Sequence, residues 1–179
     1  SGVIAGNTGF FLNDELNDFT LKAGVPNLFK LVQGKTNLIK PHKRPLSSMS
    51  PTFVMKNNKL YILVGAAGGP TIITSIVQTI ENVIDFGMTI NAGVNMPRYH
   101  MQWLPDTVFI EPYAFSSDTL KILHTMGYTT QVGFYGEPTW GQVAASVIDP
   151  ATGIMSGATD NDWPSGSALG LKHKPHNDD

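Results

Sequence analysis

Apolar residues recur at helical spacing over residues 71–86, where the sequence reads TIITSIVQTIENVIDF. Isoleucines and valines follow one another three and four residues apart, which predicts a helix with one broad apolar face. Pro70 suits the first helical position because its missing N–H costs nothing there, and Gly87 suits the C-terminal stop. A second, shorter helix is predicted over residues 118–126, between a serine pair that can cap its start and Gly127.

Short apolar runs bounded by turn residues predict strands. PTFVM (51–55) and KLYILVG (59–65) flank Lys-Asn-Asn, in which asparagine tolerates the left-handed backbone of a tight turn. Further strands are predicted in YTTQV (128–132), QVAASVI (142–148) and GIMSGAT (153–159). A strand pair followed by helices and then by more strands favours an α+β fold, with antiparallel sheet and helices packed on its faces.

The chain opens with an extended arm or strand, GVIAG, and an acidic stretch, followed by a loop rich in glycine and proline. With 41% hydrophobic and 15% charged residues, the composition is that of an ordinary globular domain. A formal net charge of −2 and a pI near 6.2 give no reason to expect nucleic acid as a partner. The chain has no cysteine, which excludes disulfides and thiolate catalysis, and no run of about 18 apolar residues that could span a membrane.

A glycine-rich turn connects a predicted strand to the first predicted helix, in LVGAAGGPTII at residues 63–73. Gly68 and Gly69 would let the backbone approach a ligand, and the helix start presents unsatisfied N–H groups. Such amides can form an oxyanion hole or bind a phosphate. A nucleotide P-loop is not supported, because the spacing is not GxxxxGK[ST] and no lysine follows. A tight turn in which glycine has only a steric role is the alternative.

Two polar clusters could hold a small charged ligand. NDELNDF gathers Asp14, Glu15 and Asp18, whose carboxylates can converge on a metal ion or an ammonium group. KRPLSSMSPTF contains Ser47 and Ser48, whose hydroxyls can donate hydrogen bonds to a carboxylate. A solvated acidic loop and local turn bonds are the structural alternatives. Together with the glycine turn, the clusters suggest a site for a free α-amino acid head followed by an acyl carbon under attack.

These stretches together resemble the small subunit of gamma-glutamyltranspeptidases (glutathione hydrolases), collinearly from about residue 2 to residue 160. The motifs are KRPLSSMSPT, GAAGG before an isoleucine-rich helix, MPRYHMQWLPD and LNDELNDF. The resemblance implies the αββα sandwich of N-terminal-nucleophile hydrolases and a precursor that cuts itself into two subunits. It also implies that the N-terminal threonine of the small subunit attacks the γ-glutamyl carbonyl to form an acyl-enzyme.

Four residues fall on positions that bind the glutamyl head group in the family. Ser47 and Ser48 fall on the serine pair that contacts the α-carboxylate. Asp18 falls on the aspartate that holds the α-amino group, and Glu15 lies where family members carry Gln or Glu near that amine.

The glycine turn matches the family's oxyanion hole. Gly68 and Gly69 fall on the glycines whose N–H groups form it. Pro70 has no N–H, which agrees with donors that precede it.

Three departures from the family pattern bear on catalysis. The nucleophilic threonine, a second threonine and an asparagine of the glutamyl site lie upstream of this chain, so the first strands are expected to be missing. The arginine that grips the α-carboxylate belongs to the large subunit. The family's Ser-Asp-Pro-Arg reads Thr159-Asp160-Asn161-Asp162 here, which leaves the role of that turn open. Residues 1–165 are therefore interpreted as the C-terminal part of a small subunit that is inactive alone, and residues 166–179 as an irregular tail.

The resemblance also implies partners and a location. The expected partners are the large subunit of the same precursor, glutathione or other γ-glutamyl compounds, and acceptor amino acids or peptides. No metal and no cofactor are expected, and the location is periplasmic, secreted or at the cell surface. An open sheet edge would further predict a homo-oligomer or strand exchange of this chain.

Three alternatives stay open at this point. The chain could belong to an acylase of the same fold that removes glutaryl side chains, as cephalosporin-type acylases do. It could be a non-catalytic module. Ser1 could itself attack through its free α-amine, although it falls beyond the strands expected to carry the nucleophile.

The remaining conspicuous side chains receive structural interpretations. His100 is expected to be packed or hydrogen-bonded, and Arg98 to anchor a turn. Core or interface positions are expected for the three tryptophans, Trp103, Trp140 and Trp163. His173 and His176 are expected to be inert.

Overall fold

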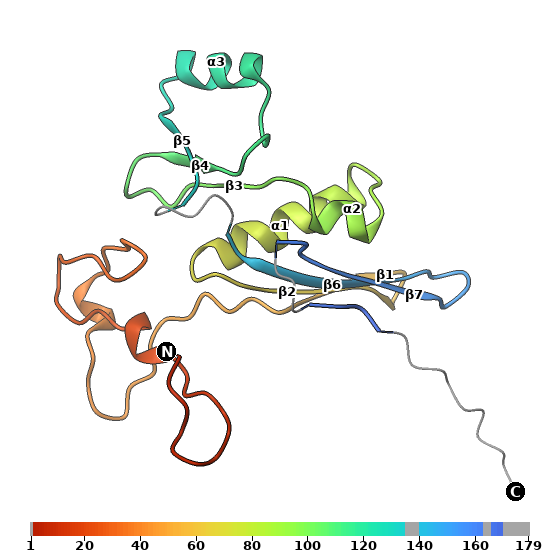
Figure 1. Ribbon diagram of the computed structural model, residues 1–179. Helices are drawn as coiled ribbons and strands as arrows, with labels where there is room; N and C mark the ends of the chain where they lie inside the picture. Colours follow the sequence, from red (N-terminus) through yellow and green to blue (C-terminus); the bar gives the residue numbers. More distant parts are fainter. Residues whose placement is uncertain (1, 135–139, 163–165, 170–179) are drawn as a thin grey trace, which may run out of the picture. The chain divides into compact units, whose positions relative to one another are not determined.

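The computed structural model describes residues 2–134, 140–162 and 166–169. The chain divides into two compact units (Figure 1): residues 1–48 with 101–107 form the first, and residues 49–100 with 108–179 form the second. The interpretations of Ser1, Trp163, His173 and His176, and of most of the tail, concern positions outside the described residues.

The second unit is built on a four-stranded antiparallel sheet in the order β1-β2-β6-β7. Its strands are β1 (Thr52–Lys56), β2 (Lys59–Ala67), β6 (Gln142–Ile148) and β7 (Met155–Thr159). They confirm four of the five predicted strands, and β5 (Thr130–Val132) in the second sheet confirms the fifth. The β1–β2 turn uses two asparagines with φ of 51° and 62°, the left-handed backbone expected of a tight hairpin turn.

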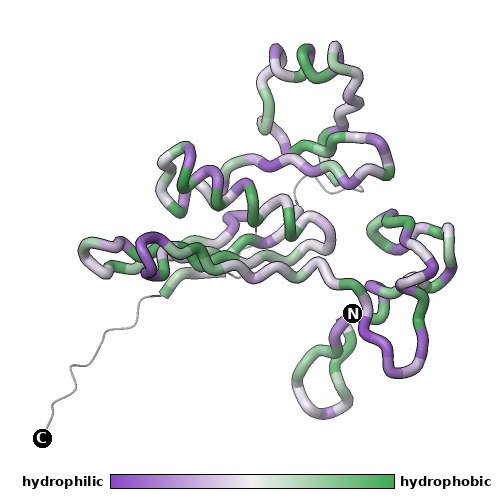
Figure 2. Tube along the Cα trace, turned by 180° about the vertical axis from the view of Figure 1, so that it is seen from behind, coloured by the Kyte–Doolittle hydropathy of each residue, from purple (hydrophilic) through white to green (hydrophobic). Residues whose placement is uncertain are grey.

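Two helices, α1 (Thr71–Ile84) and α2 (Ile90–Val94), cover one face of this sheet (Figure 1). Hydropathy alternates along α1 (Figure 2), and its inward face packs on strand residues that include the fully buried Ile62 and Val143. Pro70 has helical dihedrals, but it is the N-cap residue of α1, whereas the sequence predicts it at the first helical position. The five-residue α2 was not predicted, because it is too short to show a period.

A second, three-stranded sheet contains β3 (Tyr99–His100), β4 (Val108–Ile110) and β5 (Thr130–Val132). Strands β3 and β4 are antiparallel, as the sequence favours, whereas β5 runs parallel to β4. The parallel pairing arises because the chain crosses over through α3 (Ser117–Thr125) between β4 and β5, so that both strands run in the same direction. Ser116 caps α3 by accepting a hydrogen bond from the N–H of Thr119 at 3.2 Å, as the sequence predicts.

The first unit contains two 3-10 turns, η1 (Glu15–Asp18) and η2 (Lys35–Asn37), joined by loops. Its described residues form two isolated bridges, Ile4 to Phe11 and Thr20 to Leu38, in place of the extended arm or strand expected at the start of the chain. Side-chain hydrogen bonds therefore contribute much of its local order. Among the described residues, no helix has the length and hydropathy needed to cross a membrane.

Candidate functional site

The predicted acidic cluster lies on η1, so that Glu15 and Asp18 share one short turn. Both are half-buried, whereas Asp14 is exposed. Burial raises the pKa of Asp18, and the charge of Glu15, a hydrogen bond between the two side chains and the charge of Asp14 raise it further. Two carboxylates held this close favour a bound cation, because a positive charge relieves their repulsion.

Asn37 ties this acidic turn to the segment that carries the serine pair. Its residue is 4% exposed; Nδ2 donates to the backbone carbonyl of Asp18 at 2.7 Å, and Oδ1 accepts from the N–H of Leu46 at 3.0 Å. Leu46 directly precedes Ser47, which is exposed, and Ser48, which is half-buried. The first unit thus connects the acidic turn and the serine segment through one amide.

The glycine turn between β2 and α1 has the backbone that its sequence predicts. Gly68 and Gly69 have φ of 135° and 60°, values that residues with a Cβ rarely adopt. The carbonyl of Gly68 accepts a hydrogen bond from Thr71 Oγ1 at 2.8 Å, and that of Gly69 accepts one from the N–H of Ile72 at 3.1 Å. Within the described residues, the N–H groups of the two glycines make no hydrogen bond, so both donors face no competing acceptor there.

Gly141, the residue before β6, packs directly against this turn. A Cβ built on Gly68 would lie 2.8 Å from the Cα of Gly141 and 2.6 Å from Thr71 Oγ1. A Cβ built on Gly141, where φ is 71°, would lie 3.2 Å from both the carbonyl oxygen of Ala67 and Ser75 Oγ. Each glycine therefore fills space that a side chain on the other would need.

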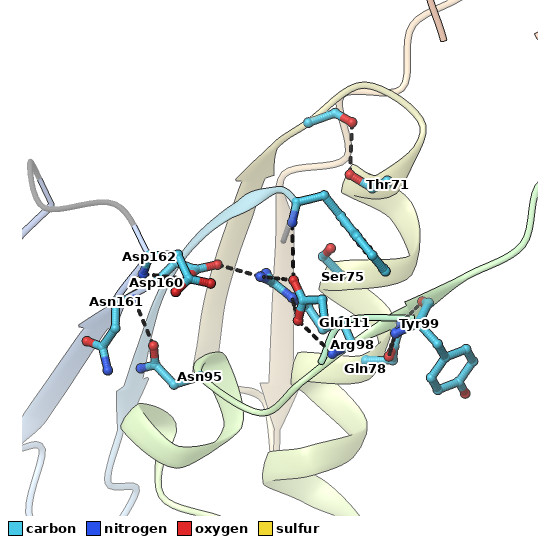
Figure 3. Close-up of polar contacts among 12 residues, drawn as sticks. Thr71, Ser75, Gln78, Asn95, Arg98, Tyr99, Glu111, Asp160, Asn161 and Asp162 are labelled. Carbon is cyan, nitrogen blue, oxygen red and sulfur yellow. Dashed lines mark hydrogen bonds and ion pairs between the residues drawn. The ribbon is translucent and has the colours of Figure 1, made fainter. Parts of the chain in front are cut away.

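A buried ion cluster in the second unit consists of Arg98, Glu111 and Asp160 (Figure 3). Arg98 Nη2 lies 2.9 Å from Glu111 Oε1 and 2.7 Å from Asp160 Oδ2, and each of the three residues is 4% exposed. The contact with Asp160 is an ion pair without hydrogen-bond geometry, whereas Glu111 accepts properly directed bonds. Burial opposes the charge of Arg98, but the hydrogen bonds to Glu111 and the negative charges of Glu111 and Asp160 outweigh burial and raise the pKa of Arg98.

The cluster also holds the strand that brings Gly141 to the turn. Glu111 Oε1 accepts a hydrogen bond from the N–H of Trp140 at 3.2 Å, and Trp140 precedes Gly141. Arg98 thus anchors more than the turn expected for it, and Asp160 has a structural partner even though the family's following arginine is replaced.

The expectation for His100 is confirmed, since its Nδ1 lies 3.0 Å from Thr74 Oγ1 and its ring packs edge-on against Phe134. Trp140 is buried as expected, but Trp103 is 74% exposed and lies outside the core of the first unit. Among the described residues, no group of three histidine or acidic side chains is arranged to hold a metal ion.

Comparison with known proteins identifies the family. The family model described as "Gamma-glutamyltranspeptidase" matches residues 1–170. The chain belongs to this family. Among curated relatives, the "Glutathione hydrolase proenzyme" of Pseudomonas sp. (strain A14) is 44% identical over 94% of this chain, and that of Escherichia coli (strain K12) is 41% identical over 89%. The chain spans 30% and 27% of the length of these two relatives.

Solved structures of the family share the fold. A threonine-to-alanine mutant of gamma-glutamyltranspeptidase from Helicobacter pylori superposes with a TM-score of 0.83 at 45% identity, covering 91% of this chain and 87% of that chain. The enzyme from Pseudomonas nitroreducens matches with a TM-score of 0.79 at 36% identity, covering 97% and 87%. These matches confirm the predicted α+β class and the N-terminal-nucleophile hydrolase fold.

The structure and the sequence differ most in what supports the site. The six residues assigned from the family motifs lie in the acidic turn and serine segment of the first unit and in the glycine turn of the second. The sequence did not reveal Asn37, which stands in an unremarkable GKTNL loop, or the Arg98–Glu111 pair, whose members are far apart in the chain. Gly141 could have been noticed as a glycine just before a strand, which often marks close backbone approach.

Proposed function

We propose that this chain supplies the donor-binding and oxyanion residues of a γ-glutamyltransferase and glutathione hydrolase. The observation that carries the proposal is the half-buried pair of carboxylates, Glu15 and Asp18, on one turn at the family's amine-binding position. An α-ammonium group placed against them would offset the repulsion that raises the pKa of Asp18. Ser47 and Ser48 would donate hydrogen bonds to the α-carboxylate of the same glutamyl group.

The proposed chemistry is acyl transfer from a γ-glutamyl amide. The hydroxyl of an N-terminal threonine, supplied from upstream of this chain, adds to the γ-carbonyl while its proton passes to the terminal amine. The N–H groups of Gly68 and Gly69 stabilise the oxyanion that forms. The amide nitrogen leaves with a proton, which gives a threonyl ester, and water or an acceptor amine then attacks that ester to release glutamate or a new γ-glutamyl amide.

The same proposal defines partners and location. The partners are the large subunit of the same precursor, glutathione or another γ-glutamyl compound as donor, and amino acids or peptides as acceptors. The protein is placed in the periplasm, outside the cell or at its surface, and cell fractionation would test that placement.

A glutaryl-removing acylase is the second candidate, since a cephalosporin acylase from Bacillus halodurans matches with a TM-score of 0.67 at 28% identity, covering 76% of this chain and 25% of that chain. A glutaryl group has no α-amine, so it would leave Glu15 and Asp18 without a cationic partner. These two carboxylates therefore favour the γ-glutamyl donor.

The test is hydrolysis of matched anilides by the intact processed protein. We expect chromophore release from a γ-glutamyl anilide and at least about 100-fold less from the glutaryl anilide, because that donor loses its ammonium contact with two partly buried carboxylates. Equal rates would favour the acylase. No release from either, in a protein whose upstream segment carries the threonine, would favour a non-catalytic module.

A further inference from the structure

Asn37 connects the two segments to which the proposed function assigns the glutamyl head group. We infer that Asn37 is a positioning residue for the donor, and that its amide sets the placement of the serine pair relative to Asp18. The inference rests on the proposed function, because it takes these segments to hold a γ-glutamyl group.

The amide of Asn37 is fully engaged, and the orientation of its oxygen and nitrogen is defined by its partners. Nδ2 donates to the carbonyl of Asp18 at 2.7 Å and to Gln33 Oε1, while Oδ1 accepts from the N–H of Leu46 at 3.0 Å. A flipped amide would direct its NH₂ group at the Leu46 donor, so one orientation satisfies all three contacts. The backbone is fixed as well, since the carbonyl of Asn37 accepts from the N–H of Thr20 at 2.9 Å.

These bonds matter because the described residues of the first unit form no sheet that could hold its loops. Thr20 and Leu38 form a single isolated bridge, and Asn37 is one of the few polar residues buried there. A buried amide bonded at every polar atom is costly to disturb, since removing it leaves the Asp18 carbonyl and the Leu46 N–H unsatisfied. The serine segment would then lose its connection to the acidic turn.

Asn27 provides a matched control in the same unit. Its Oδ1 accepts from the N–H groups of Phe29 and Leu31, both at 3.0 Å, and so closes its own loop. In the described residues, its side chain bonds neither to the acidic turn nor to the serine segment. Replacing it removes the same chemical group and a similar number of hydrogen bonds without touching the proposed donor site.

The test compares Asn37→Ala with Asn27→Ala in the intact processed protein, with a γ-glutamyl anilide as donor. We expect Asn37→Ala to raise KM about 10-fold or more while kcat changes less than about 3-fold, because donor placement is lost and the acyl-transfer groups are retained. Asn27→Ala should leave KM within about 2-fold of the unmodified protein. An equal KM for the two variants, or a loss confined to kcat, overturns the inference.

Two further measurements keep the test decisive. If Asn37→Ala does not accumulate as folded protein, Gln33→Ala replaces it. This variant removes one hydrogen-bond partner of the Asn37 amide at a half-buried position. A KM of Gln33→Ala no higher than that of Asn27→Ala then overturns the inference. Hydrogen exchange at residues 44–50 should rise in Asn37→Ala and not in Asn27→Ala, and an unchanged rate overturns the positioning role whether or not the protein is active. Absence of hydrolysis by the unmodified protein contradicts the proposed function, and the donor role of Asn37 with it.

Discussion

Asp18 and Asp149 are carboxylates whose surroundings shift their pKa in opposite directions. Burial and the neighbouring charge of Glu15 raise the pKa of Asp18, whereas hydrogen bonds from the N–H groups of Ala151 and Thr152 lower that of Asp149. A carboxylate that is hard to ionise in the native state reduces stability at neutral pH, and one that is easily ionised adds to it. The half-buried acidic turn proposed to bind the donor and the exposed turn at Asp149 therefore affect a carboxylate in opposite ways.

We predict that Asp18→Asn raises the melting temperature at pH 7 while abolishing tight donor binding. The pKa of Asp18 is higher in the native than in the unfolded protein, so ionisation of Asp18 destabilises the native state. This destabilisation is complete at pH values above the native pKa and disappears below the ordinary pKa near 4. The gain should thus vanish as pH falls through this range. Asp149→Asn should lower the melting temperature at neutral pH, with its loss also fading as pH falls. Thermal unfolding measured from pH 7 to pH 3 checks both signs, and shifts of the same sign would contradict the assignment.

We predict that Arg98→Met destabilises the protein by about 3–5 kcal/mol, because two buried carboxylates lose the cationic partner that they share. Lys121→Met is the surface control, since Lys121 and Asp118 are 76% and 83% exposed and their pair is worth less than about 1 kcal/mol. Denaturant unfolding measures both. Similar losses for the two variants would show that the Arg98 cluster does not anchor the structure of the second unit.

At the scale of the elements, the strands and helices with clear periods were predictable, and so was the three-residue β5, whereas β3, β4 and α2 were not. The run from Thr71 and the hairpin around Asn57 and Asn58 carry local signals, and the structure confirms both. The three-residue β4 and five-residue α2 lack a period, and β4 is defined by its partners rather than by its own sequence. The site follows the same division: family motifs locate the six assigned residues, while Asn37 and Gly141 act through tertiary contacts that sequence spacing does not encode.

The junction of the glycine turn with β6 gives a prediction of its own. Gly141→Ala and Gly153→Ala place a Cβ at nearly the same backbone dihedral, with φ of 71° and 73°, but only Gly141 has atoms within 4 Å of the new carbon. Both should lose about 1–2 kcal/mol from the left-handed backbone. Gly141→Ala should in addition lower kcat about 10-fold or more with little change in KM, because it displaces the Ala67 carbonyl beside the proposed oxyanion donors. Steady-state kinetics of the two variants tests this, and equal kcat values would contradict it.

At the scale of the whole molecule, one face of the four-stranded sheet carries no helix and no second sheet among the described residues of the second unit, and Ser167 and Ala168 lie along part of it. This face has a depression of about 360 Å³ whose lining includes Phe53, Leu63 and Ala144, and Phe53 is 67% exposed. Burial of such a surface is favourable by about 25 cal/mol per Å² of apolar area. The expectation of a partner, strand exchange or aggregation for this chain by itself stays a prediction.

Analytical ultracentrifugation of the chain prepared alone tests that expectation. We expect concentration-dependent association, and Phe53→Asp, which places a charge on the exposed face, should reduce it. A monodisperse monomer across the accessible concentration range would contradict the prediction.

The central claim, that this chain binds the γ-glutamyl donor through its acidic turn, is tested most directly by comparing Asp18→Ala with Asp14→Ala in the intact processed protein. The two aspartates are close neighbours and both contribute to the charge of the turn, but Asp14 is exposed and has no assigned ligand contact. We expect Asp18→Ala to raise the donor KM at least about 10-fold, as loss of a charge-assisted hydrogen bond should, and Asp14→Ala to change it less than about 3-fold. Equal effects of the two substitutions would contradict the account.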